Sequence, residues 1–159
     1  MNNHHMTTSC MLGCSQMSSR VLIVDPDACT GCRACMVACS SIKERVHGLK
    51  QARLWIQKKE VTCSSVPVVC RQCTNAPCES VCPTGAILRN PETGAYVVIS
   101  NECTGCEECV RACPFGVITV RKGLAVKCDL CEGDPECAKT CTPGAIKYVD
   151  SVTEDSKEK

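Results

Sequence analysis

Nineteen cysteines occur in a chain of 159 residues, and sixteen of them are grouped in four runs of four. The four runs are Cys29, Cys32, Cys35 and Cys39; Cys70, Cys73, Cys78 and Cys82; Cys103, Cys106, Cys109 and Cys113; and Cys128, Cys131, Cys137 and Cys141. Runs one and three are spaced C-x2-C-x2-C-x3-C, whereas runs two and four widen the middle step. Thiolates at the first spacing are ligands of [4Fe–4S] clusters. Sixteen thiolates therefore predict four cubane clusters with four ligands each.

This spacing has a physical reason. A C-x2-C-x2-C stretch can curl so that three sulfurs face one cube, and the fourth cysteine then lies on the first turn of a departing helix. In two-cluster ferredoxins, that fourth thiolate binds the other cluster of the pair. Such an exchange ties two runs together and holds their clusters within the range of electron tunnelling.

Two internal repeats indicate how the runs combine. The stretch DACTGCRAC at residues 27–35 resembles NECTGCEEC at 101–109, and APCESVCPTGAI at 76–87 resembles PECAKTCTPGAI at 135–146. Each two-cluster half then takes one short and one long run, either sequentially (one with two, three with four) or in a nested order (two with three, one with four). Runs two and three both end in Cys-Pro, and the connection between them, 20 residues, is longer than the 14 residues between runs three and four; both features favour nesting. The sequential order stays open.

Short elements surround these runs. A β-branched strand is predicted at 20–25 and a helix at 33–45. Two hairpins are predicted after runs two and three, at 86–89 with 95–99 and at 117–120 with 124–127, and a last strand reaches Val149. The predicted fold class is α+β: tandem bacterial-ferredoxin-like halves, with short hairpins and short helices wrapped around four cubane clusters.

The domain boundaries follow the cysteines. We expect a flexible N-terminal arm at 1–19, a four-cluster domain at 20–150 and a flexible tail at 151–159. Within the domain, residues 41–60 form an insert with six basic and two acidic side chains. This insert is interpreted either as a solvated hairpin with Trp55 packed inward or as a basic docking face. Three cysteines lie outside the runs and receive no role: Cys10, Cys14 and Cys63.

Composition limits the function. The chain has only four aromatic residues, so we expect the clusters to replace part of the core and folding to depend on them. A net charge of +1 gives no case for nucleic acid, and no apolar stretch reaches the roughly 20 residues that span a bilayer. No signal peptide is evident, so a cytoplasmic location is expected. No nucleotide-binding or hydrolytic motif is present, and the chain is predicted to be non-catalytic.

The ends of the runs carry a resemblance. The motifs CPTGAI at 82–87, CPFG at 113–116 and KCDLCEGDPEC at 127–137 resemble those of four-cluster ferredoxin-like electron-transfer subunits of oxidoreductases. These include β-subunits of the dimethyl sulfoxide reductase family. They also include small iron–sulfur subunits that accompany tungsten aldehyde oxidoreductases, carbon monoxide dehydrogenases and hydrogenases. The resemblance covers residues 20–149.

The resemblance implies nested pairing, four clusters in a line and no substrate of the chain's own. The implied ligand sets are Cys29, Cys32, Cys35 and Cys141 (cluster 1); Cys128, Cys131, Cys137 and Cys39 (cluster 2); Cys70, Cys73, Cys78 and Cys113 (cluster 3); and Cys103, Cys106, Cys109 and Cys82 (cluster 4). The implied partner is a catalytic subunit with a tungsten or molybdenum pterin, in first place an aldehyde oxidoreductase. A flavin subunit and contacts between copies of the chain are further candidates.

Three alternatives stay open at this point. The catalytic partner could be a carbon monoxide dehydrogenase or a hydrogenase, or the chain could be a free-standing polyferredoxin. A zinc-binding structural module is the alternative from another class, because C-x2-C pairs also hold zinc. Iron, sulfide and zinc analysis separates that module from an electron carrier, and size-exclusion chromatography separates a permanent subunit from a free carrier.

Overall fold

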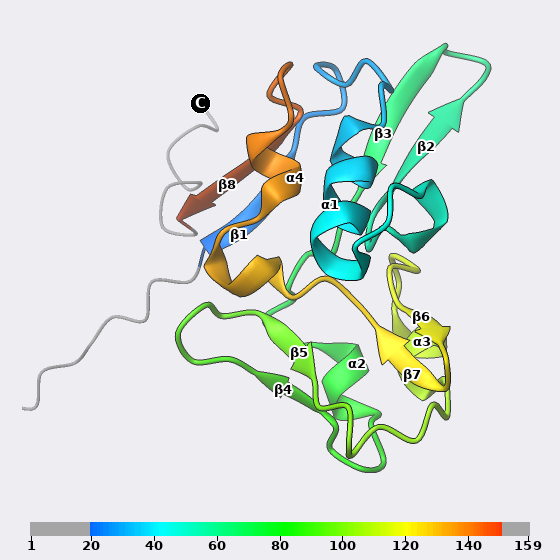
Figure 1. Cartoon of the computed structure of the whole chain (residues 1–159), viewed down its shortest axis with the longest axis vertical. Helices are drawn as coiled ribbons and strands as arrows, with labels where there is room; N and C mark the ends of the chain where they lie inside the picture. The colour runs from blue at the N-terminus through cyan, green and yellow to red at the C-terminus, as the bar shows by residue number, and fades with distance from the viewer. Residues whose placement is uncertain (1–19, 151–159) are drawn as a thin grey trace, which may run out of the picture.

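The structure is a computed structural model that describes residues 20–150. The predicted arm at 1–19, with Cys10 and Cys14, and the predicted tail at 151–159 lie outside this range. The described chain consists of short elements (Figure 1). In order they are β1 (Arg20–Val24), α1 (Ala34–Glu44), a 3-10 turn (Leu49–Gln51), β2 (Trp55–Lys59), β3 (Ser64–Val68), α2 (Pro77–Ser80), β4 (Ile87–Arg89), β5 (Tyr96–Val98), α3 (Glu108–Ala112), β6 (Thr119–Arg121), β7 (Leu124–Val126), a second 3-10 segment (Leu130–Gly133), α4 (Glu136–Lys139) and β8 (Ile146–Asp150).

The strands form four two-stranded antiparallel sheets. Three are hairpins between neighbours in sequence: β2 with β3, β4 with β5, and β6 with β7. The fourth joins the two ends of the described chain, since β1 pairs with β8 and Val21 lies opposite Val149. Helix α1 packs against α4, and α2 packs against α3. The segments that carry runs one and four are therefore neighbours, as are those that carry runs two and three (Figure 1).

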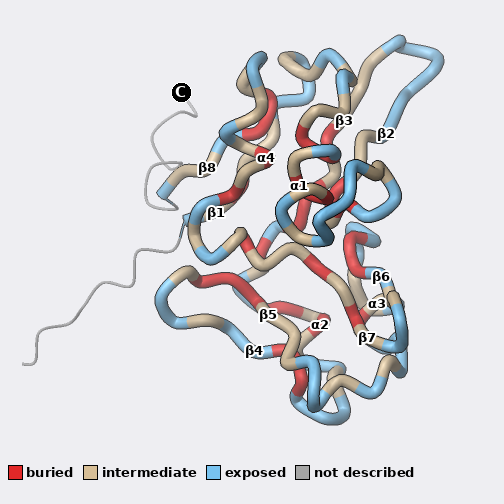
Figure 2. The backbone as a smooth tube through the Cα atoms, viewed as in Figure 1, coloured by how far each residue is buried: buried red, intermediate tan, exposed pale blue. Residues whose placement is uncertain are grey.

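Two small hydrophobic cores correspond to these two halves. The first contains Leu22, Met36, Leu130 and Ile146, together with cysteines of runs one and four. The second contains Ile87, Tyr96, Ile118 and Ala125, together with cysteines of runs two and three. Figure 2 shows the buried stretches running through the interior of both halves. Because cysteines belong to each core, the apolar side chains serve mainly to enclose the sulfurs.

The predicted elements are confirmed, with ends that differ by one or two residues. The strand predicted at 20–25 ends at Val24, and the helix predicted at 33–45 occupies Ala34–Glu44. The hairpin predicted to start at Val117 starts at Thr119, and the two residues before it, Val117 and Ile118, are buried. The α+β fold with tandem halves is as the sequence predicted.

The basic insert contains the β2–β3 hairpin. Trp55 is half-buried and packs against the first core, which agrees with the hairpin interpretation. Lys58 and Lys59 are exposed at the end of β2. Lys43 and Arg53, in contrast, contact Asp129 within the same chain. Two of the six basic side chains are thus engaged internally, and the docking role of the others stays a prediction.

Candidate functional site

Three groups of cysteines surround hollows in the described structure. Each hollow has a volume of about 310–370 Å³, which includes space open to solvent. The first is lined by Cys39, Cys128, Cys131 and Cys137, with Cys70 at its border. The second is lined by Cys70, Cys73, Cys78 and Cys113. The third is lined by Cys82, Cys103, Cys106 and Cys109. Each hollow therefore takes three cysteines from one run and a fourth from another.

The other four cysteines of the runs, Cys29, Cys32, Cys35 and Cys141, lie together around Cys35. Burial raises the pKa of the Cys35 thiol to about 11, and the next largest cause is repulsion from Cys141 of run four. Cys32 and Cys29 of its own run act in the same direction. Cys35 is buried, whereas Cys32 is exposed. Cys141 therefore lies with the first three cysteines of run one.

Burial makes the thiolate form of several cysteines in these groups unfavourable. Burial raises the pKa of the Cys128 thiol to about 12, and it also raises that of Cys137, with further contributions from Cys128 and Cys39. Several thiolates in one apolar hollow are unfavourable, because each anion is desolvated and repelled by the others. A cationic iron core offsets both costs, and metal binding of this kind releases protons from the ligands.

Backbone N–H groups point at sulfur in both halves. The amide of Arg53 donates to Sγ of Cys39 at 3.3 Å, and the amide of Ala125 donates to Sγ of Cys103 at 3.4 Å. Such donors stabilise electron-rich sulfur. All-cysteine donor sets, hollows enclosed by apolar side chains, and N–H groups aimed at sulfur together fit a [4Fe–4S] cluster.

Glycines bring other segments close to runs one and three. A Cβ on Gly31 would lie 2.5 Å from Oγ of Ser65, and one on Gly105 would lie 2.3 Å from the carbonyl oxygen of Gly123. Both glycines have positive φ, +71° and +67°. Gly31 therefore makes room for Ser65 of β3 beside run one.

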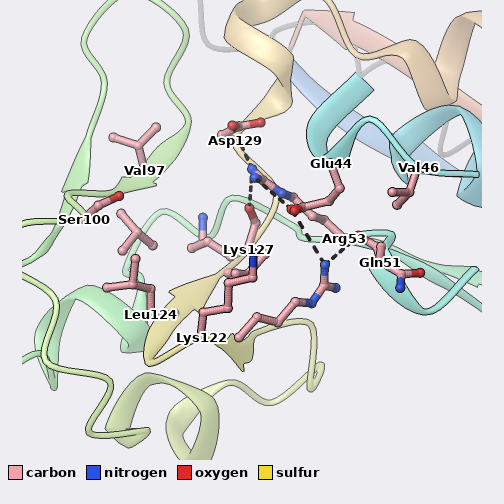
Figure 3. A pocket seen from close by; sticks show the side chains of 14 residues that line it. Glu44, Val46, Gln51, Arg53, Val97, Ser100, Lys122, Leu124, Lys127 and Asp129 are labelled. Atoms are coloured by element: carbon pink, nitrogen blue, oxygen red, sulfur yellow. Dashed lines mark hydrogen bonds and ion pairs between the residues drawn. The ribbon is translucent and has the colours of Figure 1, made fainter. Parts of the chain in front are cut away.

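A cleft lies between the two halves and is lined by an ionic network (Figure 3). Arg53 contacts Asp129 at 2.9 Å and Glu44 at 3.8 Å, and Lys43 contacts Asp129 at 2.8 Å. Burial opposes the ionised form of Asp129, but the hydrogen bond from Lys43 and the charge of Arg53 hold its pKa below the usual value. Arg121 on β6 donates to the carbonyl oxygens of Gln51 and Ala52. The contacts of Arg121 connect the half with runs one and four to the half with runs two and three, whereas the ion pairs of Asp129 and Arg53 lie within the first of these halves.

Two features are absent from residues 20–150. No group of three or more His, Cys, Asp or Glu side chains there could hold a single metal ion. Within the same range, no helix has both the length and the apolar character needed to cross a membrane. The expected cytoplasmic location and the expected lack of nucleic-acid partners stay predictions.

The chain matches two models of protein families. Residues 61–151 match the model described as "4Fe-4S dicluster domain", and residues 20–41 match one described as "4Fe-4S binding domain". The chain belongs to the 4Fe–4S dicluster family. Its cofactors are [4Fe–4S] clusters, and its sixteen grouped cysteines are consistent with four of them. The iron–sulfur prediction is confirmed, and the alternative of a zinc module is not supported.

Curated relatives in this family are electron-transfer proteins. The thiosulfate reductase electron transfer subunit of Salmonella typhi is 36% identical over 80% of this chain and 74% of its own. The polyferredoxin-like subunit of an aliphatic sulfonate oxidoreductase from Pyrococcus furiosus is 39% identical over 83% and 77%. An electron transport protein of Escherichia coli is 34% identical over 83% and 89%. Like these relatives, this family member is an iron–sulfur electron-transfer protein and not a catalytic subunit.

Sequence reasoning missed several residues around the cysteines. Lys127 and Gln72 are buried between the halves, and Arg53 is the centre of the ionic network. Lys127 directly precedes Cys128, but a lysine beside a cysteine does not reveal whether its side chain points inward. The basic composition of the insert at 41–60 partly indicated the ionic network, since two of its cations, Lys43 and Arg53, belong to it.

Proposed function

We propose that this chain relays single electrons through four [4Fe–4S] clusters between a catalytic oxidoreductase subunit and a second redox partner. The observation that carries this proposal is that the sixteen cysteines form four groups of four, two in each half of the molecule. A bound [4Fe–4S] cluster supplies reversible one-electron chemistry over a wide range of potentials, from about −700 to +450 mV.

The proposed ligand sets are the nested ones. They are Cys29, Cys32, Cys35 and Cys141; Cys39, Cys128, Cys131 and Cys137; Cys70, Cys73, Cys78 and Cys113; and Cys82, Cys103, Cys106 and Cys109. The three cysteine-lined hollows, the position of Cys141 beside Cys35, and the pairing of β1 with β8 support these sets. Sequential pairing would need Cys39 with the first three cysteines of run two and Cys82 with those of run one, whereas Cys39 lines a hollow with run four and Cys82 lines one with run three.

Within this function, the chain has three tasks: to bind the clusters, to exclude water and to fix their order. Cys70 borders the hollow of Cys128 and helps to line its own, so these two sets are neighbours. The Cys35 set and the Cys103 set are then the ends of a linear array. Cys32 and Cys106, one in each end set, are exposed, which supports access for a partner at either end.

The proposed catalytic partner carries a tungsten or molybdenum pterin and is of the aldehyde oxidoreductase type. The support is the resemblance of the motifs at 82–87, 113–116 and 127–137. That relatives are named as subunits of a thiosulfate reductase and a sulfonate oxidoreductase supports an oxidoreductase partner more broadly. A carbon monoxide dehydrogenase or a hydrogenase, with a flavin subunit as second partner, is the alternative.

Anaerobic purification from native cells tests the relay. We expect about sixteen iron and sixteen sulfide per chain, four cubanes with all sites filled. We also expect elution well above the 17.1 kDa of the chain alone, together with a subunit that contains tungsten or molybdenum. Eight or fewer iron per chain would contradict the four-cluster array. A fully loaded species of 17 kDa that is active alone would contradict the permanent-subunit proposal.

A further inference from the structure

One lysine is buried at the junction of the two halves. Lys127, directly after β7, retains 3% of its surface exposure, and the neighbouring Gln72 retains 7%. Lysine is almost never fully buried without partners, because removing an ammonium group from water is costly. Its position therefore needs an explanation beyond the apolar packing around it.

The ammonium group of Lys127 has three acceptors. Its Nζ donates to the carbonyl oxygen of Tyr96 at 2.5 Å, to that of Cys128 at 3.1 Å and to Oε1 of Gln72 at 3.4 Å. An ammonium has three N–H donors, so this set satisfies all of them. The charge is thus held in place by neutral acceptors, and no carboxylate among its hydrogen-bond partners cancels it.

Gln72, in run two, fixes this arrangement. Its Oε1 also accepts from the amide of Tyr96 at 3.0 Å, while its Nε2 donates to the carbonyl oxygen of Cys128 at 3.0 Å. Gln72 lies between Cys70 and Cys73 and has a left-handed backbone, with φ of +47°. The side chain is therefore directed into the junction, where it contacts both Lys127 and the segment entering run four.

Lys127 faces the cysteines of run two. It lines the same hollow as Cys70, Cys73, Cys78 and Cys113. Burial raises the pKa of the Cys78 thiol, and the largest opposing cause is the positive charge of Lys127. The other cation that lines this hollow, Arg71, is exposed and lies over the ring of Phe115 at 5.6 Å.

We propose that Lys127, held by Gln72, is a positioning residue that raises the reduction potential of the cluster bound by Cys70, Cys73, Cys78 and Cys113. This inference rests on the proposed ligand sets. Reduction adds one negative charge to a cluster, and a nearby cation screened by little water stabilises that added charge. The lysine therefore makes this central cluster of the array easier to reduce than it would be with the same cysteine ligands and no nearby cation.

The competing explanation is that Lys127 only joins the halves. The reduction potential separates the two explanations. A purely structural contact would change the stability of the protein without shifting the potential of one particular cluster. The cluster in question is the one whose electron paramagnetic resonance signal changes in both Cys78→Ser and Cys113→Ser. Its midpoint potential is then measured by anaerobic redox titration in the intact, fully loaded protein.

We expect Lys127→Met to reduce the ratio of reduced to oxidised cluster at a fixed potential about tenfold, which for one electron is a shift of about 59 mV to lower potential. Lys127→Arg retains the positive charge, so its cluster should keep a potential close to that of the unsubstituted protein. Lys122→Gln is the matched control, because it removes an exposed lysine from the turn of the same hairpin. This control should leave the potential unchanged.

A second variant covers the case in which Lys127→Met does not retain its iron. Gln72→Glu keeps both the volume and Lys127, and its carboxylate should lower the same potential. An unchanged potential in Gln72→Glu, or equal shifts in Lys127→Met and Lys127→Arg, would overturn the inference. Failure of the ligand sets would show differently: Cys78→Ser and Cys113→Ser would alter two different clusters in a protein whose Lys127 is intact.

Discussion

At the scale of single residues, the thiol positions identify the cofactor, but the partner of each fourth cysteine depends on the fold. Cys113 ends run three and yet lines a hollow with three cysteines of run two. Cys82 ends run two and lines a hollow with run three. Cys82 follows α2 and Cys113 follows α3. Each short helix carries the fourth thiol away from the first three cysteines of its run and places it beside the other run.

A substitution at Cys113 tests this exchange. We expect Cys113→Ser to alter the same cluster signal as Cys78→Ser and to lower iron by up to about four atoms per chain, the content of one cubane. Cys63→Ser is the control, since Cys63 is exposed and lies outside the runs. Its iron content should stay the same. Paramagnetic resonance and iron analysis provide the measurements, and a Cys113→Ser spectrum that matches Cys109→Ser instead would rule out the exchange.

At the scale of elements, glycines permit segments from different parts of the chain to approach the cysteine runs. The turn between β6 and β7 reaches run three at Gly105, where the space for a side chain is occupied by the backbone of Gly123. Gly85 follows run two with nearly the same φ, +66°, but nothing lies within 4 Å of its Cβ position. Both positions impose the same backbone strain on a side chain, but only Gly105 also imposes a steric collision. A comparison of substitutions at the two glycines therefore separates these two effects.

Alanine at these positions should have unequal effects. A left-handed non-glycine residue costs about 1–2 kcal/mol, and we expect Gly85→Ala to show only that loss of stability, with its full content of iron. Gly105→Ala carries the same cost and also collides with Gly123, so we expect the cluster held by Cys103, Cys106 and Cys109 to be lost or displaced. Iron per chain and the cluster spectrum measure this difference. Equal behaviour of the two variants would mean that the turn moves freely.

At the scale of the whole molecule, polar contacts join two halves that each have a core of their own. Arg121 on β6 donates across the junction to the carbonyl oxygens of Gln51 and Ala52. Beside it, Arg53 links Asp129 to Glu44 (Figure 3), and Lys43, 86 positions from Asp129, contacts the same carboxylate; these four side chains all lie on segments of the half with runs one and four. These side chains are 14–34% exposed, so their charges are only partly screened by water. The relative position of the halves matters for function because it sets the distance between the central cysteine groups.

Removal of the shared carboxylate should weaken the half that carries runs one and four. Asp129→Asn leaves Lys43 and Arg53 without their common anion, and we expect a loss of about 2 kcal/mol in the free energy of unfolding. Glu108→Gln is the control, because Glu108 pairs with Arg111 on an exposed helix surface, where ion pairs contribute little. Anaerobic guanidinium unfolding, followed by cluster absorbance, compares them. Equal midpoints for both variants would show that the network adds no more than a surface pair.

The sequence alone determined the cofactor, the strands and hairpins, and the two kinds of run. These features depend on contacts within about ten residues, such as the C-x2-C steps and the turns after runs two and three, so spacing is sufficient to predict them. The sequence left both sequential and nested pairing of the runs open, because both orders satisfy the same local spacing.

Only the tertiary structure decided which groups meet at the junction. Gln72 and Lys127 are 55 positions apart, and neither carries a local signal that it is buried or that the two side chains are in contact. Asp129 likewise belongs to an acidic stretch in the sequence, but in the fold its charge is offset by Lys43 and Arg53. The contact of Lys43 with Asp129 accompanies the packing of α1 on α4 and the pairing of β1 with β8, and the contact of Gln72 with Lys127 forms where run two meets the end of the β6–β7 hairpin. The energy of such contacts depends on the assembled halves and not on neighbours in the chain.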